Sequence, residues 1–360
     1  MSITFGANTA PSVITKYLDS LFSQSYANYS KNIADSIGTS NAFFHKIREG
    51  ELYEGEEGGT DIRLPTLYEL ATMESYADYD EFGTQPVDGV TQSVWEWRQL
   101  ACPIAYSMAE VLKNRNGLKN MVKTRIQQSE LGIQEGWANA FFQGNGDGAL
   151  STPKTNPGNS SLSFEPLPKL VAYDPTASVE IGNINQNTST WWRNKTKESA
   201  ATTLTGFIQE VNNMYNTCSL GTGGAPDLIV CDQITYELFT AAYYLKYHNQ
   251  TSQPNNFPFE ATRFKKAIVT MDEKIPDVFT NVTSAATFGT MYFLNSKFFR
   301  VKYMKGRDFE LLKDDNGKSF QKPLNGDSRV GHVAWMGQCC ISARRKHGVI
   351  GKIARTLTAT

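Results

Sequence analysis

The residues best suited to chemistry in this sequence are four carboxylates in one short segment. Paired carboxylates can act as general acid and base, or can hold a cation, when a fold fixes their separation. Turn-forming residues such as Gly83 and Pro86 follow them, so the pattern favours a solvated hairpin tip or a patch that meets a basic neighbour. The segment supplies our first candidates for contact with a neighbouring chain: Glu74, Asp78, Asp80 and Glu81.

Other signatures of catalysis are missing from the sequence. It has no Walker A motif, no G-x-S-x-G elbow, no H-E-x-x-H helix and no C-x-x-C pair. Its four histidines are far apart, and its five cysteines favour buried free thiols over disulfides. The run Gly144–Gly148 lacks the ligands of an EF-hand or a P-loop, so it is predicted to end a helix. We expect no enzyme activity, no catalytic residue, no metal site and no cofactor.

Clustered aromatic and basic side chains form the remaining candidates. The segment Trp191-Trp192-Arg193 could stack on nucleic acid, although two anchors that bury a loop are the favoured interpretation. A basic run near the C-terminus could face DNA or an acidic neighbour, or could be a solvated face. The net charge of −1 argues against a chain that coats nucleic acid by itself. The contact candidates from these groups are Trp95 and Trp97, and the basic ones are Arg344, Arg345 and Lys346.

The N-terminal third of the sequence predicts extended elements that would position the acidic tip. Residues 1–50 are polar with scattered aromatics, as in an arm that lies on another surface. Residues 50–60 hold four glycines and four glutamates and predict a flexible hinge. Two strand-forming segments, 61–70 and 93–102, flank the acidic tip and predict a long two-stranded ribbon. An isolated ribbon is marginal in water, so we expect neighbouring chains to cover it.

The rest of the sequence predicts an α+β fold. Residues 105–143 have the longest helical pattern, with an apolar stripe that mostly steps by four residues. Residues 149–200 are predicted to be mainly loop, and no run of about 18–20 apolar residues predicts a membrane span. The chain is therefore expected in the cytoplasm after synthesis. Further helices are predicted at 201–217 and 232–247, and strands at 227–232, 267–271, 290–294, 298–304, 309–312 and 330–341.

Four segments in the second half of the chain carry a family resemblance. They are Gly182-Asn183-Ile184 with Trp191-Trp192-Arg193-Asn194, then Pro226–Asp232, then Met291–Asn295, and finally the run from Val330 to Ile353. In this order and spacing they resemble the major capsid proteins of tailed bacteriophages, of the Hong Kong 97 type, whose fold also occurs in encapsulins. Related sequences often have an acidic and a basic residue after the Gly-x-Ile, where this chain has Asn185 and Gln186.

This resemblance implies a domain organisation for the whole chain. It implies an N-terminal arm at 1–50 and an E-loop ribbon at 51–104, whose return strand would contain Trp95 and Trp97. It implies a P-domain at 105–200 and 325–343, with its spine helix at 118–143. The A-domain would comprise 201–324 and 344–360.

The resemblance also implies a structural function. The chain would be a major capsid protein whose pentamers and hexamers form an icosahedral or prolate phage head around double-stranded DNA. It would belong to the virion, after assembly in the host cytoplasm. Its partners would be further copies of itself, a portal, and a separate scaffold or decoration protein, with non-specific contacts to DNA and none to membranes. The alternatives are an encapsulin-like compartment with protein cargo and, from another class, a soluble hydrolase with a carboxylate pair.

Overall fold

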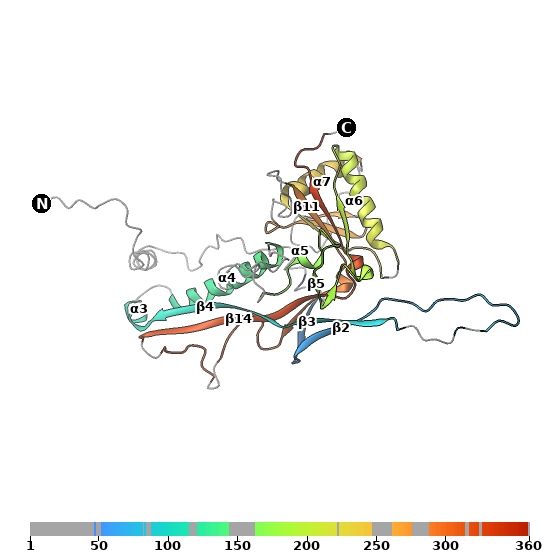
Figure 1. The fold of residues 1–360 in the computed structure, drawn as a ribbon. Coiled ribbons are helices and arrows are strands. Elements are labelled where there is room, and N and C mark those ends of the chain that lie inside the picture. Colours follow the sequence, from blue (N-terminus) through green and yellow to red (C-terminus); the bar gives the residue numbers. More distant parts are fainter. Residues whose placement is uncertain are drawn as a thin grey trace. The chain divides into compact units, whose positions relative to one another are not determined.

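The protein has an α+β fold, as the sequence predicts. Figure 1 shows the computed structural model, which describes residues 47, 52–81, 83, 88–114, 121–143, 163–221, 223–246, 261–275, 288–313, 317–323 and 326–358. The predicted arm at 1–50, apart from Ile47, lies outside the described residues, as do Leu118 and the glycine run at 144–148. Among the helices that the structure describes, none is long and apolar enough to cross a membrane.

The helices of the described residues vary widely in length. The longest, α4, covers most of the helix that the apolar stripe predicts, and it ends two residues after the last member of that stripe, Phe141. Ile133, Trp137 and Phe141 of that stripe are buried, whereas Val122 and Ile126 are half-buried. The helices are α3 (Met108–Lys113), α4 (Met121–Gln143), α5 (Leu167–Leu170), α6 (Leu204–Ser219) and α7 (Gln233–Lys246), with the 3-10 turns η2 (Thr190–Trp192), η3 (Ser296–Phe298) and η4 (Arg344–Lys346).

The chain forms two compact units. Within the described residues, the smaller unit comprises Ala101–Gln134 and Phe309–Ala334. The larger unit comprises Ser40–Leu100, Glu135–Asp308 and Trp335–Thr360. Both units are assembled from segments that are distant in sequence, so neither corresponds to one continuous stretch of chain.

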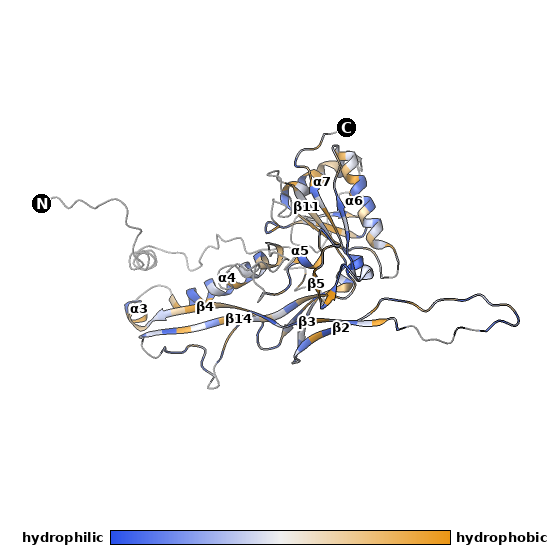
Figure 2. Ribbon diagram, in the orientation of Figure 1, coloured by the Kyte–Doolittle hydropathy of each residue, from blue (hydrophilic) through white to orange (hydrophobic). Residues whose placement is uncertain are grey.

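A six-stranded mixed sheet with two helices forms the main core of the larger unit. The central strand β8 is buried at all four positions, as its continuous apolar run predicts. Phe207 of α6 and Phe239 of α7 pack into one apolar cluster with residues of the sheet, and Figure 2 shows hydrophobic residues alternating with hydrophilic ones along these helices. The strands, in spatial order, are β7 (Lys195–Glu198), β15 (Gly348–Ile353), β11 (Gly289–Leu294), β8 (Leu228–Cys231), β10 (Ala267–Met271) and β9 (Ala261–Phe264).

A second sheet contains a strand that the sequence did not predict. Strand β12 (Phe299–Met304) pairs antiparallel with β14 (Ser328–Ile341) on one side. On its other side it pairs parallel with β1 (Tyr53–Glu56). The predicted flexible hinge at 50–60 is therefore wrong for this part of the segment. Its glycines and glutamates have low strand propensity, but pairing with β12 and the cations of β12 overrides that propensity.

The predicted ribbon is present, with different limits on its return strand. Strand β2 (Asp61–Leu67) pairs antiparallel with β3 (Val90–Glu96), from Asp61 opposite Glu96 to Leu67 opposite Val90. The strand predicted at 93–102 is in fact two strands, because the chain leaves the ribbon at Trp97. The next strand, β4 (Arg98–Ser107), pairs with β14 instead of β2.

In the smaller unit, strands β4, β13 (Glu310–Leu311) and the first part of β14 are combined with α3 and the first part of α4. Helix α3 begins with a capping box, in which the Ser107 side chain accepts from the helix backbone and Glu110 accepts from the Ser107 N–H. Arg125 of α4 binds Glu110 at 3.0 Å and donates to the Ala105 carbonyl oxygen at 2.6 Å. These bonds connect α3, α4 and β4 within the unit.

Candidate functional site

The ribbon divides into two parts at the point where its strand pairing ends. The Tyr68 N–H donates to the Gly89 carbonyl oxygen at 2.9 Å, beyond the last paired residues of β2 and β3. A Cβ at Gly89 would overlap the Glu69 carbonyl oxygen, so only glycine allows the two backbones to approach this closely. We call residues 61–68 and 89–97 the ribbon root, and residues 69–88 the distal segment.

The described part of the distal segment presents apolar and acidic side chains to solvent. Tyr79 is 100% exposed and Met73 is 93% exposed. No lysine or arginine occurs between Arg63 and Arg98, so the acids have no cation in their own segment. Large apolar side chains this exposed, in a row with such acids, indicate a surface that another molecule covers. The four predicted acids are all exposed: Glu74, Asp78, Asp80 and Glu81.

The carboxylates of the distal segment stabilise local turns. Asp80 Oδ2 accepts from the Ala77 N–H at 2.8 Å, and Glu74 Oε2 accepts from the Gly83 N–H at 3.1 Å. Within the residues that the structure describes, no group of three or more His, Cys, Asp and Glu side chains could hold a metal ion.

The ribbon root is fixed by a tight turn between β5 (Glu180–Ile181) and β6 (Ile184–Asn185). Gly182 and Asn183 both have positive φ, 62° and 60°, as in the primed turns of two-residue hairpins. The Gly182 carbonyl oxygen accepts from the Val94 N–H at 3.0 Å. A Cβ at Gly182 would lie 2.9 Å from Trp95 Cζ2, so the indole packs directly on the turn. The Gly182-Asn183-Ile184 turn therefore supports the ribbon root, through its contacts with Val94 and Trp95.

Trp95, which the sequence offers as a contact candidate, packs within its own chain. It is only 2% exposed, and its Nε1–H donates to Ser93 Oγ at 3.0 Å. Trp97 is half-buried and donates from Nε1 to the Gly59 carbonyl oxygen at 3.0 Å. Only Trp97 of the two retains a partly exposed face.

The two adjacent tryptophans of the Trp191-Trp192 motif hold different parts of the structure. The Trp191 ring stacks on Tyr68 of the ribbon root, with centroids 5.1 Å apart. The Trp192 side chain is buried, and its Nε1–H donates to the Ile181 carbonyl oxygen at 3.0 Å. These contacts confirm the interpretation of the motif as two anchors that bury a loop.

Arg344 lies at the centre of this support and is fully buried, at 0% exposure. Its guanidinium donates only to neutral oxygens, and burial lowers its pKa to about 9. Gln186, which stands where related sequences often have a charged residue, supplies one of these acceptors. The acceptors are the carbonyl oxygens of Lys169 (3.5 Å), Leu170 (2.8 Å) and Trp192 (3.3 Å), Gln186 Oε1 (3.1 Å) and Asn194 Oδ1 (3.0 Å).

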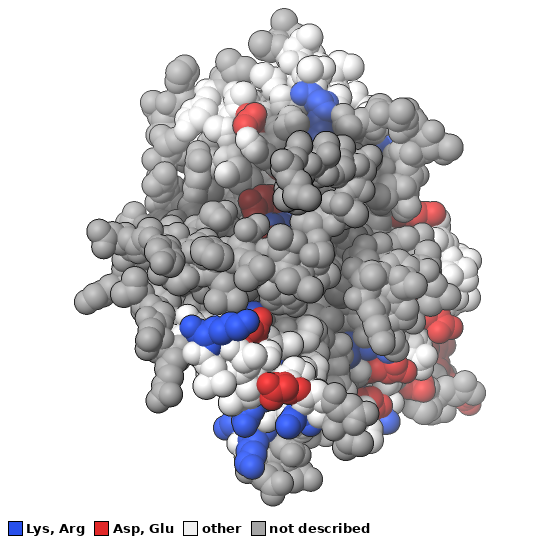
Figure 3. All heavy atoms as spheres, turned by 90° about the vertical axis from the view of Figure 1, so that its left-hand side faces the viewer, with Lys and Arg blue, Asp and Glu red and all other residues white. Residues whose placement is uncertain are grey.

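The basic run, which the sequence offers as a DNA-facing or neighbour-facing patch or as a solvated face, is mostly buried within the chain. Lys346 is 1% exposed, and its Nζ donates to the carbonyl oxygens of Leu220 at 2.6 Å and Gly221 at 3.1 Å, just beyond the C-terminus of α6. Of the three basic residues, Arg345 alone is exposed. The turn η4 directs alternate residues inward, which a charge run in the sequence cannot reveal. On the face drawn in Figure 3, acidic and basic side chains are interspersed.

His347 is a buried titratable group that sequence reasoning missed. Its Nδ1 accepts from the Asn295 N–H at 3.3 Å, so the imidazole is held neutral. Burial, and then the charge of Arg344, lower its pKa to about 3. Next to a cationic run, a histidine is usually taken as an exposed charge, and no local signal in the sequence indicates that it is enclosed.

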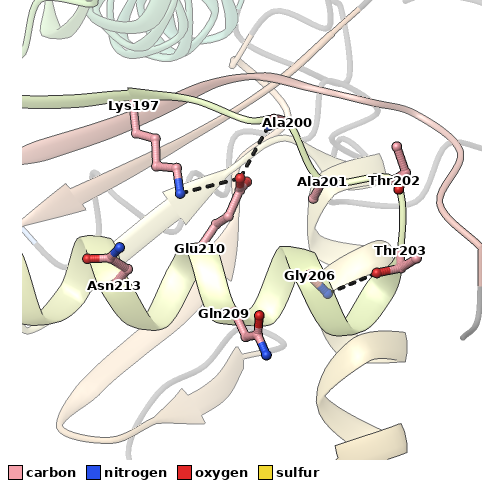
Figure 4. A pocket seen from close by; sticks show the side chains of 9 residues that line it. All are labelled: Lys197, Ala200, Ala201, Thr202, Thr203, Gly206, Gln209, Glu210 and Asn213. Atoms are coloured by element: carbon pink, nitrogen blue, oxygen red, sulfur yellow. Dashed lines mark hydrogen bonds and ion pairs between the residues drawn. The ribbon is translucent and has the colours of Figure 1, made fainter.

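A polar hollow of about 430 Å³ lies beside the N-terminus of α6, and Figure 4 shows that Lys197 and Glu210 point toward each other there. Glu210 accepts from Ser199 Oγ at 2.7 Å and the Ala200 N–H at 3.2 Å, and it pairs with Lys197 at 3.3 Å. Its carboxylate is thus occupied by its own chain.

Comparison with known proteins identifies the fold. No protein-family model matches the sequence, and no curated protein matches it. Among solved structures, the capsid asymmetric unit of cyanophage A-1(L) has a TM-score of 0.67 at 11% identity, over 91% of this chain and 97% of that chain. The encapsulin complex of Synechococcus elongatus PCC 7942 has a TM-score of 0.58 at 8% identity, over 98% of this chain and 99% of that chain. The capsid of a native GTA particle has a TM-score of 0.57 at 10% identity, over 97% and 100%.

These likenesses extend over nearly the full length of both partners in each comparison. Their sequence identity is low, so what they share is the fold. The chain has the fold of phage capsid and encapsulin proteins, as the sequence resemblance implies.

Proposed function

We propose that the protein is the major capsid protein of a tailed phage or prophage, with the Hong Kong 97-type fold. In this proposal, its pentamers and hexamers form an icosahedral or prolate head around double-stranded DNA. The observation that carries the proposal is the distal segment, an exposed apolar and acidic surface on a chain with a capsid fold. A structural role accounts for that surface. In a closed lattice, a neighbouring subunit covers the apolar side chains that the isolated subunit exposes to water.

The proposed domain organisation follows the family. The arm is residues 1–50, and the E-loop is the ribbon at 51–104. The P-domain is 105–200 with 325–343, including the spine helix at 118–143, and the A-domain is 201–324 with 344–360. The strand and turn boundaries described above support the E-loop assignment, because the anchored root and the solvent-exposed distal segment are what a ribbon that reaches a neighbour requires.

We further propose that the acids of the distal segment meet basic residues of a neighbouring subunit. The absence of lysine and arginine from Leu64 to Trp97 supports this, since the segment has no cations of its own to pair with. Other partners in the proposal are a portal, a separate scaffold or decoration protein, and DNA through non-specific contacts. The protein would assemble in the host cytoplasm and remain in the virion.

The proposal is tested by electron microscopy of the full-length protein after size-exclusion chromatography, alone and with neighbouring open reading frames co-expressed. Closed shells or rings of five and six subunits are expected. A monodisperse monomer under both conditions would contradict the proposal.

The role of the acids is tested by reversing three charges, with Asp78→Lys, Asp80→Lys and Glu81→Lys in one variant. Particle yield should fall sharply while the melting temperature of the unassembled subunit stays the same. The neutral variant Asp78→Asn, Asp80→Asn and Glu81→Gln is the matched control, and its yield should be intermediate. Normal yield from the charge-reversed variant would refute the role of these acids.

An encapsulin-like compartment is the second candidate, and it is favoured by the 0.58 TM-score to the S. elongatus encapsulin complex over 98% of this chain. The two candidates share a shell and differ in contents. Purified particles should contain nuclease-protected DNA if the chain is a phage capsid protein. Particles that instead hold one dominant cargo protein, encoded beside the shell gene, would favour the compartment.

A further inference from the structure

Strand β1 is attached to the larger unit in an unusual way. It is four residues long and none of its residues is fully buried. Among the described strands it pairs only with β12, at the edge of its sheet. The Val301 N–H donates to the Leu52 carbonyl oxygen at 2.7 Å, and the Lys305 N–H donates to the Glu56 carbonyl oxygen at 3.0 Å. Backbone hydrogen bonds of an edge strand that has few buried apolar contacts open easily.

Ion pairs supply most of the side-chain contacts of β1 and the residue after it. Arg300 Nε lies 2.7 Å from Glu54 Oε1, and Lys302 Nζ lies 2.5 Å from Glu56 Oε1 and 3.6 Å from Glu54 Oε2. Lys305 Nζ lies 2.8 Å from Glu57 Oε1. The glutamates are 42%, 39% and 85% exposed, so salt in the solvent screens these pairs.

One aromatic contact fixes the start of the strand. The Tyr53 ring stacks on Tyr303 with centroids 4.3 Å apart, and the Tyr53 hydroxyl accepts from Trp335 Nε1 at 2.9 Å and donates to Asp308. A Cβ at Gly55 would lie 2.9 Å from the Tyr303 ring, so the ring covers the strand at this point. The strand therefore has an aromatic anchor at its beginning and charge pairs along the rest of its length.

We propose that β1 is an electrostatic latch, which closes on β12 at neutral pH and low salt and opens locally when its ion pairs are screened or protonated. The chain enters β1 from the N-terminal residues and continues from it into the ribbon root. Opening would therefore free the start of the ribbon root while the other strands of the sheet stay paired. This inference does not depend on the proposed function.

The charged groups around the latch determine its pH range. Besides the three glutamates and their cations, the groups facing it are Asp308 beside Tyr53 and Cys340 of β14 near Lys302, and Glu165 acts in turn on Cys340. The hydrogen bond from Lys305, then its charge, lower the pKa of Glu57. Burial lowers the pKa of Lys302, but the hydrogen bond and charge of Glu56 raise it by more, and the pKa of Lys305 is raised mainly by its hydrogen bond to Glu57.

The direction of the pH effect follows from these shifts. A carboxyl group with a lowered pKa stabilises the closed latch while it is ionised, and this contribution disappears as the pH falls through that pKa. A lysine with a raised pKa stabilises the closed latch while it is charged, and this contribution disappears as the pH rises through its pKa. The latch is therefore closed at neutral pH and weakens toward both extremes.

Amide hydrogen exchange on the unassembled full-length subunit tests the proposal. The reporters are the N–H groups of Val301 and Lys305, which are protected only while β1 is docked. The reference is the Phe293 N–H in β11, in the other sheet. Raising the salt from about 50 mM to about 1 M at pH 7 should lower the protection of the two reporters about tenfold and leave the reference unchanged.

Three variants separate the ion pairs from the rest of the attachment. The variant Glu54→Gln, Glu56→Gln, Glu57→Gln should have low reporter protection that no longer responds to salt. Glu54→Arg alone should lower the protection of the reporters. Adding Arg300→Glu exchanges the two charges, and should restore part of that protection and its response to salt. Reporter protection that salt does not change, or that falls together with the reference, would overturn the proposal.

Discussion

The ribbon root and the distal segment belong to the same ribbon, yet different interactions determine their structures. In the root, Trp95 is 2% exposed and packs on the Gly182 turn. In the distal segment, Tyr79 is 100% exposed and the carboxylate of Asp80 bonds within the segment. The root buries Trp95 within its own chain, whereas the distal segment leaves Tyr76 and Tyr79 in water.

The difference between the two regions shows where this subunit is complete and where it is not. The hydrophobic effect stabilises a segment only when apolar surface leaves water. The root satisfies that condition within one chain, through Gly182, Trp191 and the buried Arg344. The described side chains of the distal segment do not satisfy it within the chain, and in our proposal a neighbouring molecule covers them. Substitutions in the root should therefore change subunit stability, and substitutions in the distal segment should change assembly.

The largest effect on stability is expected at Arg344, the centre of the root's support. Arg344→Ala removes the donor from four buried oxygens and one partly buried oxygen and opens a cavity, so the free energy of unfolding should fall by about 3 kcal/mol or more. Urea denaturation followed by tryptophan fluorescence measures this. Arg344→Lys keeps the charge without the forked donors and should lose less. A change within about 0.5 kcal/mol for Arg344→Ala would show that the root does not depend on this residue.

A smaller loss in the free energy of unfolding is expected at the turn on which Trp95 packs. Gly182→Ala combines a positive φ with a Cβ 2.9 Å from the indole, which should cost about 2 kcal/mol. Gly224→Ala is the matched control, because Gly224 also has positive φ but a Cβ added there would meet no atom within 4 Å. It should cost only about 1 kcal/mol. Thermal unfolding of both variants tests the difference, and equal losses would mean that contact with Trp95 does not matter.

The next largest effect is a pH-dependent loss in the free energy of unfolding, which is due to His347. Its folded-state pKa is about 3, whereas an unfolded histidine has a pKa near 6.5, so the unfolded state binds a proton first as the pH falls. The stability that the neutral histidine contributes is present above about pH 6.5. About 1.5 kcal/mol of it should be lost between about pH 6.5 and pH 5.

Denaturation at several pH values measures that slope. His347→Gln should reduce it, whereas His332→Gln, at an exposed histidine, should leave it as in the natural protein. Parallel slopes in all three proteins would contradict the burial of a neutral His347.

The smallest effect on subunit stability is expected in the distal segment. Met73→Ser with Tyr79→Ser removes side chains that contact little in the subunit, so the free energy of unfolding should change by less than about 0.5 kcal/mol. Particle yield should nevertheless fall, because these side chains are the apolar part of the proposed contact. Leu220→Ser, at an apolar residue that is 73% exposed outside the ribbon, tests whether any exposed apolar residue has the same effect. A lower free energy of unfolding in the variant with Met73→Ser and Tyr79→Ser would contradict the view that the distal segment contributes little to the stability of the subunit.

The elements that the sequence predicted well are those with strong local patterns. The apolar run at 227–232 became the buried strand β8, and Asp232 accepts from the Thr235 N–H at the start of α7, as an N-cap does. The apolar spacing at 201–217 became α6. In these cases hydrophobic periodicity and capping act over neighbouring residues, so the sequence alone contains the information.

The features that the sequence did not predict depend on partners far away in the chain. Strand β1 exists because Glu54 and Glu56 meet cations of β12, some 250 residues later. Arg344 was predicted to be exposed because its acceptors, at positions 169–194, are invisible in the local sequence. The acids of the distal segment were recognised as a contact candidate from their turn residues, and the exposed Met73 and Tyr79 beside them were not singled out.

The absence of lysine and arginine from the ribbon between Arg63 and Arg98 has a practical consequence. Trypsin has no cleavage site there, whereas chymotrypsin can cut at the exposed aromatic residues Tyr76 and Tyr79. The two proteases therefore distinguish accessibility of the ribbon from general unfolding of the chain. If chymotrypsin cleaves the ribbon of the free chain but not the ribbon of the chain in particles, gel electrophoresis of the digests would show that assembly covers the ribbon.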